Sequence, residues 1–227
     1  MDCQTAVSDL LSFLNTFRGS NFIALAERVH FASNAKNKNA LLIRRLLEGF
    51  KGPEYLGTLC EFANLSIKTI QLKENGRPKE AMSFSSFDYI DIVNETWEAS
   101  QVKRTFSKTF LFAVFQQTPS LNLFKGAFLW KMPDDDLLGE VKEVWQRTVD
   151  ILKSGRIVVC EKGRMVLAFP RESETKVCHV RPHGKNALDL SKLPVLDSGL
   201  NYKGLSKQSF WLNHGYVGGI VNKNFPD

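Results

Sequence analysis

The spacing of apolar residues divides the chain into a helical first part and a remainder rich in strands. Apolar residues recur at helical spacing over Val7–Phe17, Phe22–His30 and Ala40–Phe50, and Gly52-Pro53 is expected to end the third segment. We therefore predict a small helical layer over residues 1–52.

The period changes after this layer. Leu65–Leu72 alternates apolar and polar residues, which is typical of a half-buried strand, and Asn75-Gly76 favours the tight turn of a hairpin. The apolar run Phe110–Phe115 and the alternating segment Leu123–Lys131 predict central strands. Further strands are expected at Ile157–Cys160, Met165–Phe169 and Val177–Val180, the first two as a hairpin around Lys162-Gly163.

A helix is expected between the two groups of strands. Pro133 followed by Asp134, Asp135 and Asp136 is typical of a helix start, because prolines and acids suit the positive N-terminal end. This helix should run to about Lys153 and stop at Ser154-Gly155. Helices before and within a run of strands predict an α/β or α+β class. We expect one compact domain over 1–227, in which 53–227 forms the sheet-containing core.

Composition excludes several classes of protein. Hydrophobic residues at 43% and charged residues at 24% are ordinary globular values and exclude disordered and fibrous chains. No run of eighteen apolar residues predicts a membrane span, and Met1-Asp2-Cys3-Gln4 lacks the features of a signal peptide. We expect a cytoplasmic protein without a membrane partner. The four scattered cysteines, Cys3, Cys60, Cys160 and Cys178, predict reduced thiols.

The excess of basic residues is concentrated in three stretches. The net charge is +6, and 99–133, 175–188 and 198–226 each contain basic residues and no acid. This distribution favours a polyanion as partner. A solvated basic surface without a partner is the alternative.

Several segments resemble one enzyme family in the same order along the chain. Leu65–Thr69 and Gly76–Glu80 resemble the catalytic strand and hairpin of MutH, the GATC-nicking mismatch-repair endonuclease. Thr96–Ser100 resembles its Trp-Glu element, Cys178–His183 its Arg-Pro DNA-reading loop, and Lys207–Asn213 its last reading element.

The similarity is greater to the carboxy-terminal copy in two-domain, GATC-specific type II restriction enzymes. In that copy, strings such as Cys-His-Val-Arg-Pro-His and Lys-Gln-Ser-Phe-Trp also occur together. The resemblance extends from about Leu41 to Tyr216. It implies a restriction-endonuclease-like fold with a mixed central sheet flanked by helices. It also implies binding of double-stranded DNA containing GATC.

The catalytic pattern of the family is incomplete in this sequence. The family places an Asp before Glu-x-Lys to hold Mg²⁺ and to activate water. Lys68 matches the lysine, but Ser66 stands at the glutamate position, and a serine hydroxyl lacks the charge that a hard cation prefers. Glu61 is a displaced candidate for the missing acid. We therefore expect Glu61, Ser66 and Lys68 to be vestigial, with no catalytic residue set intact and no cofactor for this domain.

A second segment matches the Asp and Glu-x-Lys pattern by coincidence. Asp134, after Pro133, and Glu140-Val141-Lys142 fit this pattern, but they fall in the predicted helix. Residues two apart on a helix point in different directions, so Glu140 and Lys142 are not expected to share a metal.

The DNA-reading segments are better preserved. Arg181 is expected to donate two hydrogen bonds to a guanine edge, and Pro182 to stiffen the loop that presents it. An ion pair of Arg181 with Glu172 or Glu174 is the alternative. The other predicted DNA contacts, to bases or phosphates, are His183, Lys185, Lys207, Trp211, Lys103, Arg104 and Lys108.

Neighbouring residues are interpreted as structural. Trp97 is expected to fill the core, and Glu98 to orient a nearby lysine. Of Phe210 and Trp211, one should lie in the core and the other against DNA. Cys178, His179 and His183 are too few, and wrongly spaced, for a zinc site.

Three functions follow from these patterns. The first is a catalytically silent, GATC-binding domain that activates or tethers a catalytic MutH-like domain in the same chain or in another subunit. The second is an active Mg²⁺-dependent endonuclease whose carboxylates come from displaced positions such as Glu61 and Glu74. The third is a protein-interaction module.

Overall fold

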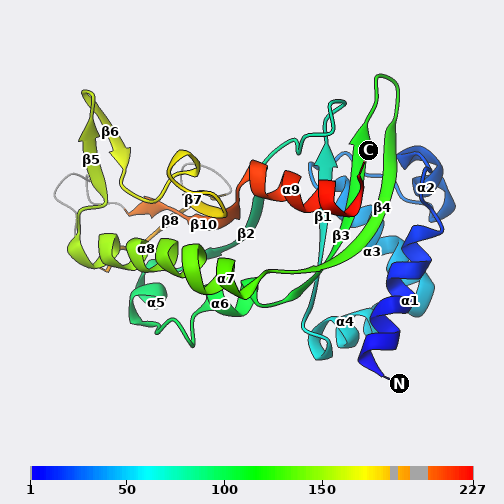
Figure 1. Ribbon diagram of the computed structural model, residues 1–227, viewed down its shortest axis with the longest axis horizontal. Coiled ribbons are helices and arrows are strands. Elements are labelled where there is room, and N and C mark those ends of the chain that lie inside the picture. Colours follow the sequence, from blue (N-terminus) through cyan, green and yellow to red (C-terminus); the bar gives the residue numbers. More distant parts are fainter. Residues whose placement is uncertain (1, 185–188, 195–203, 227) are drawn as a thin grey trace. The chain divides into compact units, whose positions relative to one another are not determined.

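The computed structural model describes residues 2–184, 189–194 and 204–226 (Figure 1). Contacts within the chain group into two compact units. Unit 1 comprises Met1–Glu80, Lys108–Lys131 and Asn222–Asp227, and unit 2 comprises Ala81–Ser107 and Met132–Val221. The prediction of one domain with a boundary at residue 52 stays a prediction.

Four helices open unit 1. They are α1 (Cys3–Asn15), α2 (Phe22–Arg28), α3 (Lys38–Lys51) and α4 (Pro53–Phe62). Side-chain oxygens of Asp2 and Asn21 accept hydrogen bonds from the first free backbone N–H groups of α1 and α2. The three predicted helices are confirmed. Helix α4 was not predicted, because Gly52-Pro53 reads as a stop signal in the sequence.

The junction between α3 and α4 explains that omission. Gly52 adopts a φ of +89°, which turns the chain sharply, and Pro53 then occupies the first position of the next helix. Proline is suited to that position, because the N–H group that it lacks has no partner there.

The sheet of unit 1 has the order β1-β3-β4. Strand β1 (Leu65–Leu72) runs parallel to β3 (Thr109–Gln117), and β3 runs antiparallel to β4 (Asn122–Lys131). This confirms the three predicted strands and the mixed α/β class. The helices pack on one face, in a core that includes Leu10, Leu14, Leu42, Ile43, Leu111, Ala113, Phe115 and Phe124. The other face carries Phe110, Phe112, Phe128 and Trp130.

Unit 2 contains an antiparallel sheet with the order β2-β10-β7. Its strands are β2 (Met82–Phe87), β10 (Gln208–Leu212) and β7 (Cys178–Pro182). The turn predicted after β1 is present, with Gly76 at a φ of +73°, but the hairpin ends at the bridge between Leu72 and Pro78. The next strand, β2, pairs with β10 rather than with β1.

The remaining helices of unit 2 include two that the pattern did not predict. These are α5 (Tyr89–Asn94) and α6 (Gln101–Phe106), started by the capping side chains of Asp88 and Ser100. The predicted long helix is confirmed as α7 (Asp134–Asp136), a π-helical segment (Leu137–Val141) and α8 (Lys142–Ser154). Gly139 interrupts its helical dihedral angles, and Gly155 ends it in a left-handed conformation. The last helix, α9 (His214–Asn224), was not predicted either; its residues as far as Val221 belong to unit 2 and the rest to unit 1.

Short elements complete unit 2. The predicted hairpin is confirmed as β5 (Val158–Glu161) and β6 (Arg164–Leu167), with Lys162 and Gly163 in its turn. A 3-10 turn (Glu172–Glu174) precedes β7, and β8 (Leu190–Ser191) pairs with β9 (Leu205–Ser206). Of the helices described, none has the length and apolar character that crossing a membrane requires.

Helix α1 is joined to the sheet of unit 1 by one side chain. Asn15 Nδ2 donates to the carbonyl of Ala127 on β4 at 3.0 Å, and Oδ1 accepts from the N–H of the same residue at 2.8 Å. The side-chain amide of Asn15 therefore pairs with both backbone groups of Ala127, as a neighbouring strand would.

We predict that Asn15→Ala lowers the free energy of unfolding by about 1–3 kcal/mol, because it leaves the backbone groups of Ala127 without this partner. Urea unfolding measures the change. Ser12→Ala, at an exposed position of the same helix, is the control and should change stability much less. Equal losses in the two variants would contradict this assignment.

Candidate functional site

The residues predicted to be vestigial, Glu61, Ser66 and Lys68, lie in unit 1. Ser66 and Lys68 are two apart on β1 and share a face, opposite Phe110 and Phe112 of β3. Burial lowers the pKa of Lys68, because the charged ammonium loses hydration on this face. Glu61 lies in the last turn of α4 and is exposed. Asn64, at a φ of +47°, leads from that helix into β1.

The sheet of unit 1 does not fit a two-carboxylate magnesium site. None of the residues of β1, β3 and β4 is Asp or Glu. Within the described ranges 2–184, 189–194 and 204–226, no three His, Cys, Asp or Glu residues form a group suited to a metal. Mg²⁺ prefers several carboxylate or water oxygens in octahedral geometry, and Ser66 contributes only a neutral hydroxyl.

The second segment that matches the Asp and Glu-x-Lys pattern, at Asp134 and Glu140–Lys142, is helical, as predicted. Glu140 lies on the helical segment that leads into α8, and its carboxylate accepts hydrogen bonds from the backbone N–H groups of Lys176 and Val177. Glu140 therefore holds the start of β7.

The predicted DNA-reading residues Arg181 and Trp211 meet on the sheet of unit 2. Strands β7 and β10 pair so that Arg181 lies opposite Ser209 and His179 lies opposite Trp211. Because side chains alternate along a strand, these four residues share one face of the sheet. The other face carries Val180 and Phe210 into the core, where Phe210 packs on Phe87 at 5.4 Å between ring centroids.

Trp211 is enclosed by three cationic or titratable side chains. The guanidinium carbon of Arg181 lies over the indole at 4.5 Å from its centroid. The ring of His183 meets it edge-on at 5.2 Å, and the ring of His179 lies nearly parallel at 6.5 Å. We call His179, Arg181, His183 and Trp211 the Trp211 cluster.

Phe210 and Trp211 point to opposite faces, as expected, and both are buried, with 3% and 8% of their surfaces exposed. The DNA contact of Trp211 stays a prediction. Trp211 does not present its ring to solvent because Arg181 and His183 cover it. Arg181 itself is exposed.

The alternative ion pairs of Arg181 are absent among the described residues, because both candidate acids are engaged elsewhere. Glu172 bonds the ring nitrogen of His214 at 2.9 Å, and also its backbone N–H. Partial burial opposes ionisation of Glu172, but these bonds from His214 lower its pKa overall. Glu174 pairs with Arg171 at 2.7 Å and with Arg147 at 3.5 Å.

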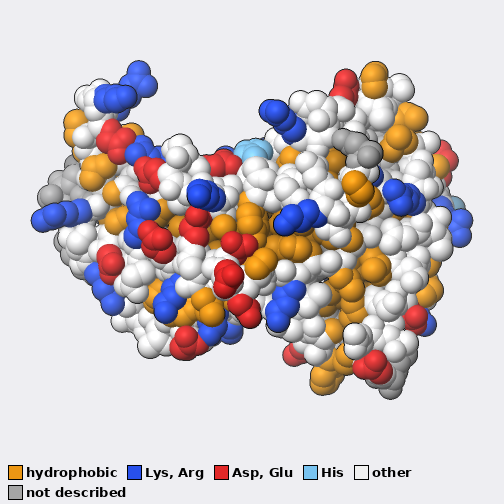
Figure 2. Space-filling view, in the orientation of Figure 1, with side chains coloured by type: hydrophobic (Ala, Val, Ile, Leu, Met, Phe, Trp, Pro, Cys, Tyr) orange, Lys and Arg blue, Asp and Glu red, His pale blue; other side chains and the backbone are white. Residues whose placement is uncertain are grey.

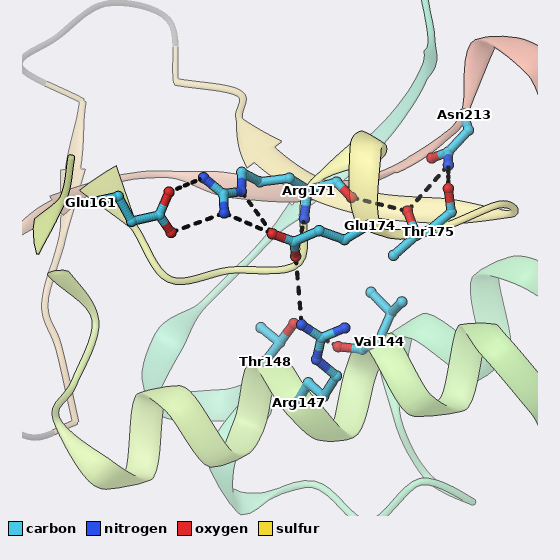
Figure 3. A network of polar contacts seen from close by, with 8 residues as sticks. All are labelled: Val144, Arg147, Thr148, Glu161, Arg171, Glu174, Thr175 and Asn213. Atoms are coloured by element: carbon cyan, nitrogen blue, oxygen red, sulfur yellow. Dashed lines mark hydrogen bonds and ion pairs between the residues drawn. The ribbon is translucent and has the colours of Figure 1, made fainter. Parts of the chain in front are cut away.

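A polar network holds the loop that feeds β7 (Figure 3). The guanidinium of Arg171 binds both oxygens of Glu161, on β5, at 2.7 and 2.9 Å, and also binds Glu174. Thr175 donates to the carbonyl of Arg171, and the amide of Asn213 donates to Thr175. The network therefore ties the β5–β6 hairpin and the end of β10 to the start of the strand that carries Arg181.

Asn213 also orients His179. Because its amide nitrogen donates to Thr175, its Oδ1 accepts from Nδ1 of His179 at 2.6 Å. Burial lowers the pKa of His179, which favours the neutral ring. Burial likewise raises the pKa of the neighbouring Cys178 thiol. Asn213 was not among the predicted site residues, although it lies in the segment Lys207–Asn213 that resembles the family.

The predicted phosphate contacts have local partners. Lys103 pairs with Glu98, as expected for an acid that orients a lysine, and Arg104 bonds the carbonyl of Ala99. Trp97 is buried against Trp145, also as expected. Figure 2 shows acidic and basic side chains mixed over α8, so the visible face of this helix is not a basic patch.

The other predicted contacts lie on different segments. Lys108 belongs to unit 1, next to β3. Lys207 pairs with Asp189 at 2.9 Å, and its carbonyl accepts from the N–H of His183. Pro182 ends β7 and is exposed. Lys185 lies outside the described residues. The roles of all of these residues in binding DNA stay predictions.

Comparison with known proteins gives two matches. Residues 60–138 match the family described as DNA mismatch repair enzyme MutH. The chain is also 30% identical over 185 residues to the type II restriction enzyme Sau3AI of Staphylococcus aureus. Over the matched residues the chain is therefore MutH-like. The second match covers 69% of this MutH-like chain and 38% of the relative, so the chain spans well under half of that protein.

The lowered pKa of His179 predicts a pH dependence of stability. In the unfolded chain this histidine takes up a proton near pH 6.5, whereas the folded state resists protonation until a lower pH. The unfolded state therefore binds more protons in that window, and the contribution of His179 to stability is lost as the pH falls below about 6.5.

We predict that His179→Asn, whose side-chain amide can place an N–H donor at the position of Nδ1 but does not titrate, reduces the loss of stability on acidification. Urea unfolding of both proteins at a series of pH values measures the difference. If the free energy of unfolding falls equally with pH in both proteins, His179 does not contribute to the loss of stability in acid.

Proposed function

We propose that this MutH-like chain binds double-stranded DNA of the GATC type through the sheet of unit 2 and does not itself cleave it. The proposal of DNA binding rests on the environment of Arg181. This arginine is exposed, it lies over Trp211, and Glu172 and Glu174 pair with other residues. An arginine held in this way keeps its N–H donors available for a guanine edge.

The proposal of catalytic silence is supported by the sheet of unit 1. Phosphodiester hydrolysis by the family mechanism needs carboxylates beside the lysine, and β1 offers Ser66 beside Lys68. The only retained member of the pattern on this strand is the lysine. Such a domain would act by tethering or activating a catalytic MutH-like domain, in the same chain or in another subunit.

We predict that the purified chain leaves a GATC-containing duplex intact in the presence of Mg²⁺ or Mn²⁺, because β1, β3 and β4 carry no acid to hold the cation beside Lys68. Gel electrophoresis of end-labelled duplex measures cleavage. Cleavage that Lys68→Ala abolishes would establish the alternative, an active nuclease with displaced carboxylates such as Glu61 or Glu74. In that case Glu61→Gln and Glu74→Gln would identify which acid takes part.

We predict that Arg181→Ala weakens binding to the GATC duplex by about 1–3 kcal/mol and reduces its preference over a scrambled duplex, because a base contact is lost. Fluorescence anisotropy at one fixed salt concentration measures both affinities. Arg164→Ala, which removes an equal charge from the exposed β6 strand, is the control. Lys103→Ala should weaken both duplexes alike, as expected for a phosphate contact.

Two results would contradict these assignments. If Arg181→Ala and Lys103→Ala change the two affinities in the same way, the division between base and phosphate contacts is wrong. If the wild-type chain binds both duplexes weakly and equally, the chain is better described as a protein-interaction module.

A further inference from the structure

The environment of Trp211 differs from that of an ordinary core tryptophan. Its neighbours on the same face of the sheet are polar, namely His179, Arg181 and Ser209. Its indole N–H is buried, and no described residue accepts a hydrogen bond from it. Because a buried donor without a partner is unfavourable, the N–H does not explain why a tryptophan occupies this position.

The face of the indole ring does have a partner. Arg181 lies over it at 4.5 Å, within the distance at which a guanidinium is attracted to an aromatic face. A flexible arginine loses much side-chain freedom when it binds, and contact with a fixed ring restricts it in advance. The ring itself is fixed by β10, which pairs with β7 on one side and with β2 on the other.

The strand register makes this contact specific. Arg181 lies opposite Ser209, and Trp211 is the next residue on the same face of β10, so the arginine reaches it diagonally across the pair. The ring of His183 lies nearly perpendicular to the indole, with 5.2 Å between the ring centroids, and the backbone N–H of His183 donates to the carbonyl of Lys207 at 2.8 Å. The indole therefore contacts both Arg181 and His183.

We propose that Trp211 is a positioning residue: it does not contact DNA but holds the guanidinium of Arg181 in the orientation that reads a base. This inference rests on the proposed DNA binding through Arg181. It assigns Trp211 a role other than the direct DNA contact expected from the sequence, because the ring is buried and Arg181 lies over it.

The test uses two substitutions of different chemistry. Trp211→Leu removes the aromatic face, and Trp211→Phe keeps a smaller one; neither breaks a hydrogen bond with a described residue. Ser209→Ala is the matched control, since this buried hydroxyl lies opposite Arg181 and also has no described partner. The ratio of affinities for GATC and scrambled duplexes should fall roughly 2- to 30-fold in Trp211→Leu and less in Trp211→Phe. It should be unchanged in Ser209→Ala.

A double-mutant cycle separates positioning from a general structural role. If Trp211 acts through Arg181, Trp211→Leu should change the ratio no further once Arg181 is already alanine. If the two effects simply add, Trp211 acts independently of Arg181 and the proposal is overturned. An unchanged ratio in Trp211→Leu alone also overturns it.

A measurement without DNA distinguishes this proposal from the proposed function. NMR relaxation of the ¹⁵Nε–H group of Arg181 measures the order of this side chain. We expect an ordered side chain in the wild type and in Ser209→Ala, and a mobile one in Trp211→Leu. Unchanged order in the leucine variant overturns the positioning role, whatever the DNA result. If the order is lost as expected but the wild type shows no preference for GATC, the proposed function fails while the contact between Arg181 and Trp211 stands.

Discussion

The pairing of β10 with β7 is the constraint on which the second unit depends. This register brings Phe210 and Leu212 to the apolar face, and Ser209 and Trp211 to the face of Arg181. A slip of one residue would exchange the two faces, which would move Phe210 under Arg181 and Trp211 into the core. Asn213, directly after β10, reinforces the register by binding both Thr175 and His179.

The first unit depends on a different interaction, the packing of aromatic side chains on its sheet. Aromatic side chains of β3 and β4 stack on one face, with Phe110 and Phe112 both fully buried. Lys68 lies on this face, and the loss of hydration lowers its pKa. Burial on this face disfavours the charge of Lys68, and the residue two positions before it, Ser66, is neutral.

The elements that could be predicted are those with long, regular patterns. The alternation over Leu65–Leu72 and the apolar run Phe110–Phe115 predicted β1 and β3 correctly, because each of these patterns continues over several residues. Helices α5 and α6 are short, and α4 begins at a residue pair that usually ends a helix. Their formation depends on single caps and on packing, which periodicity does not reveal. The turn at Gly76 was predicted because it is local, whereas the pairing of β2 with β10 joins segments far apart in the chain and was not predicted.

The sequence by itself determined the chemistry present at each position: Lys68 beside Ser66, Arg181 before Pro182, and a hydrophobic pair at Phe210 and Trp211. Only the tertiary structure decided how these groups are used. Glu174 is close to Arg181 in the chain, yet it binds Arg171 and Arg147, because the loop before β7 brings those cations nearer. Trp211 lies beneath Arg181 because two strands separated by many residues pair in one register. Contacts of this kind depend on distances between remote segments, and local residue preferences carry no information about those distances.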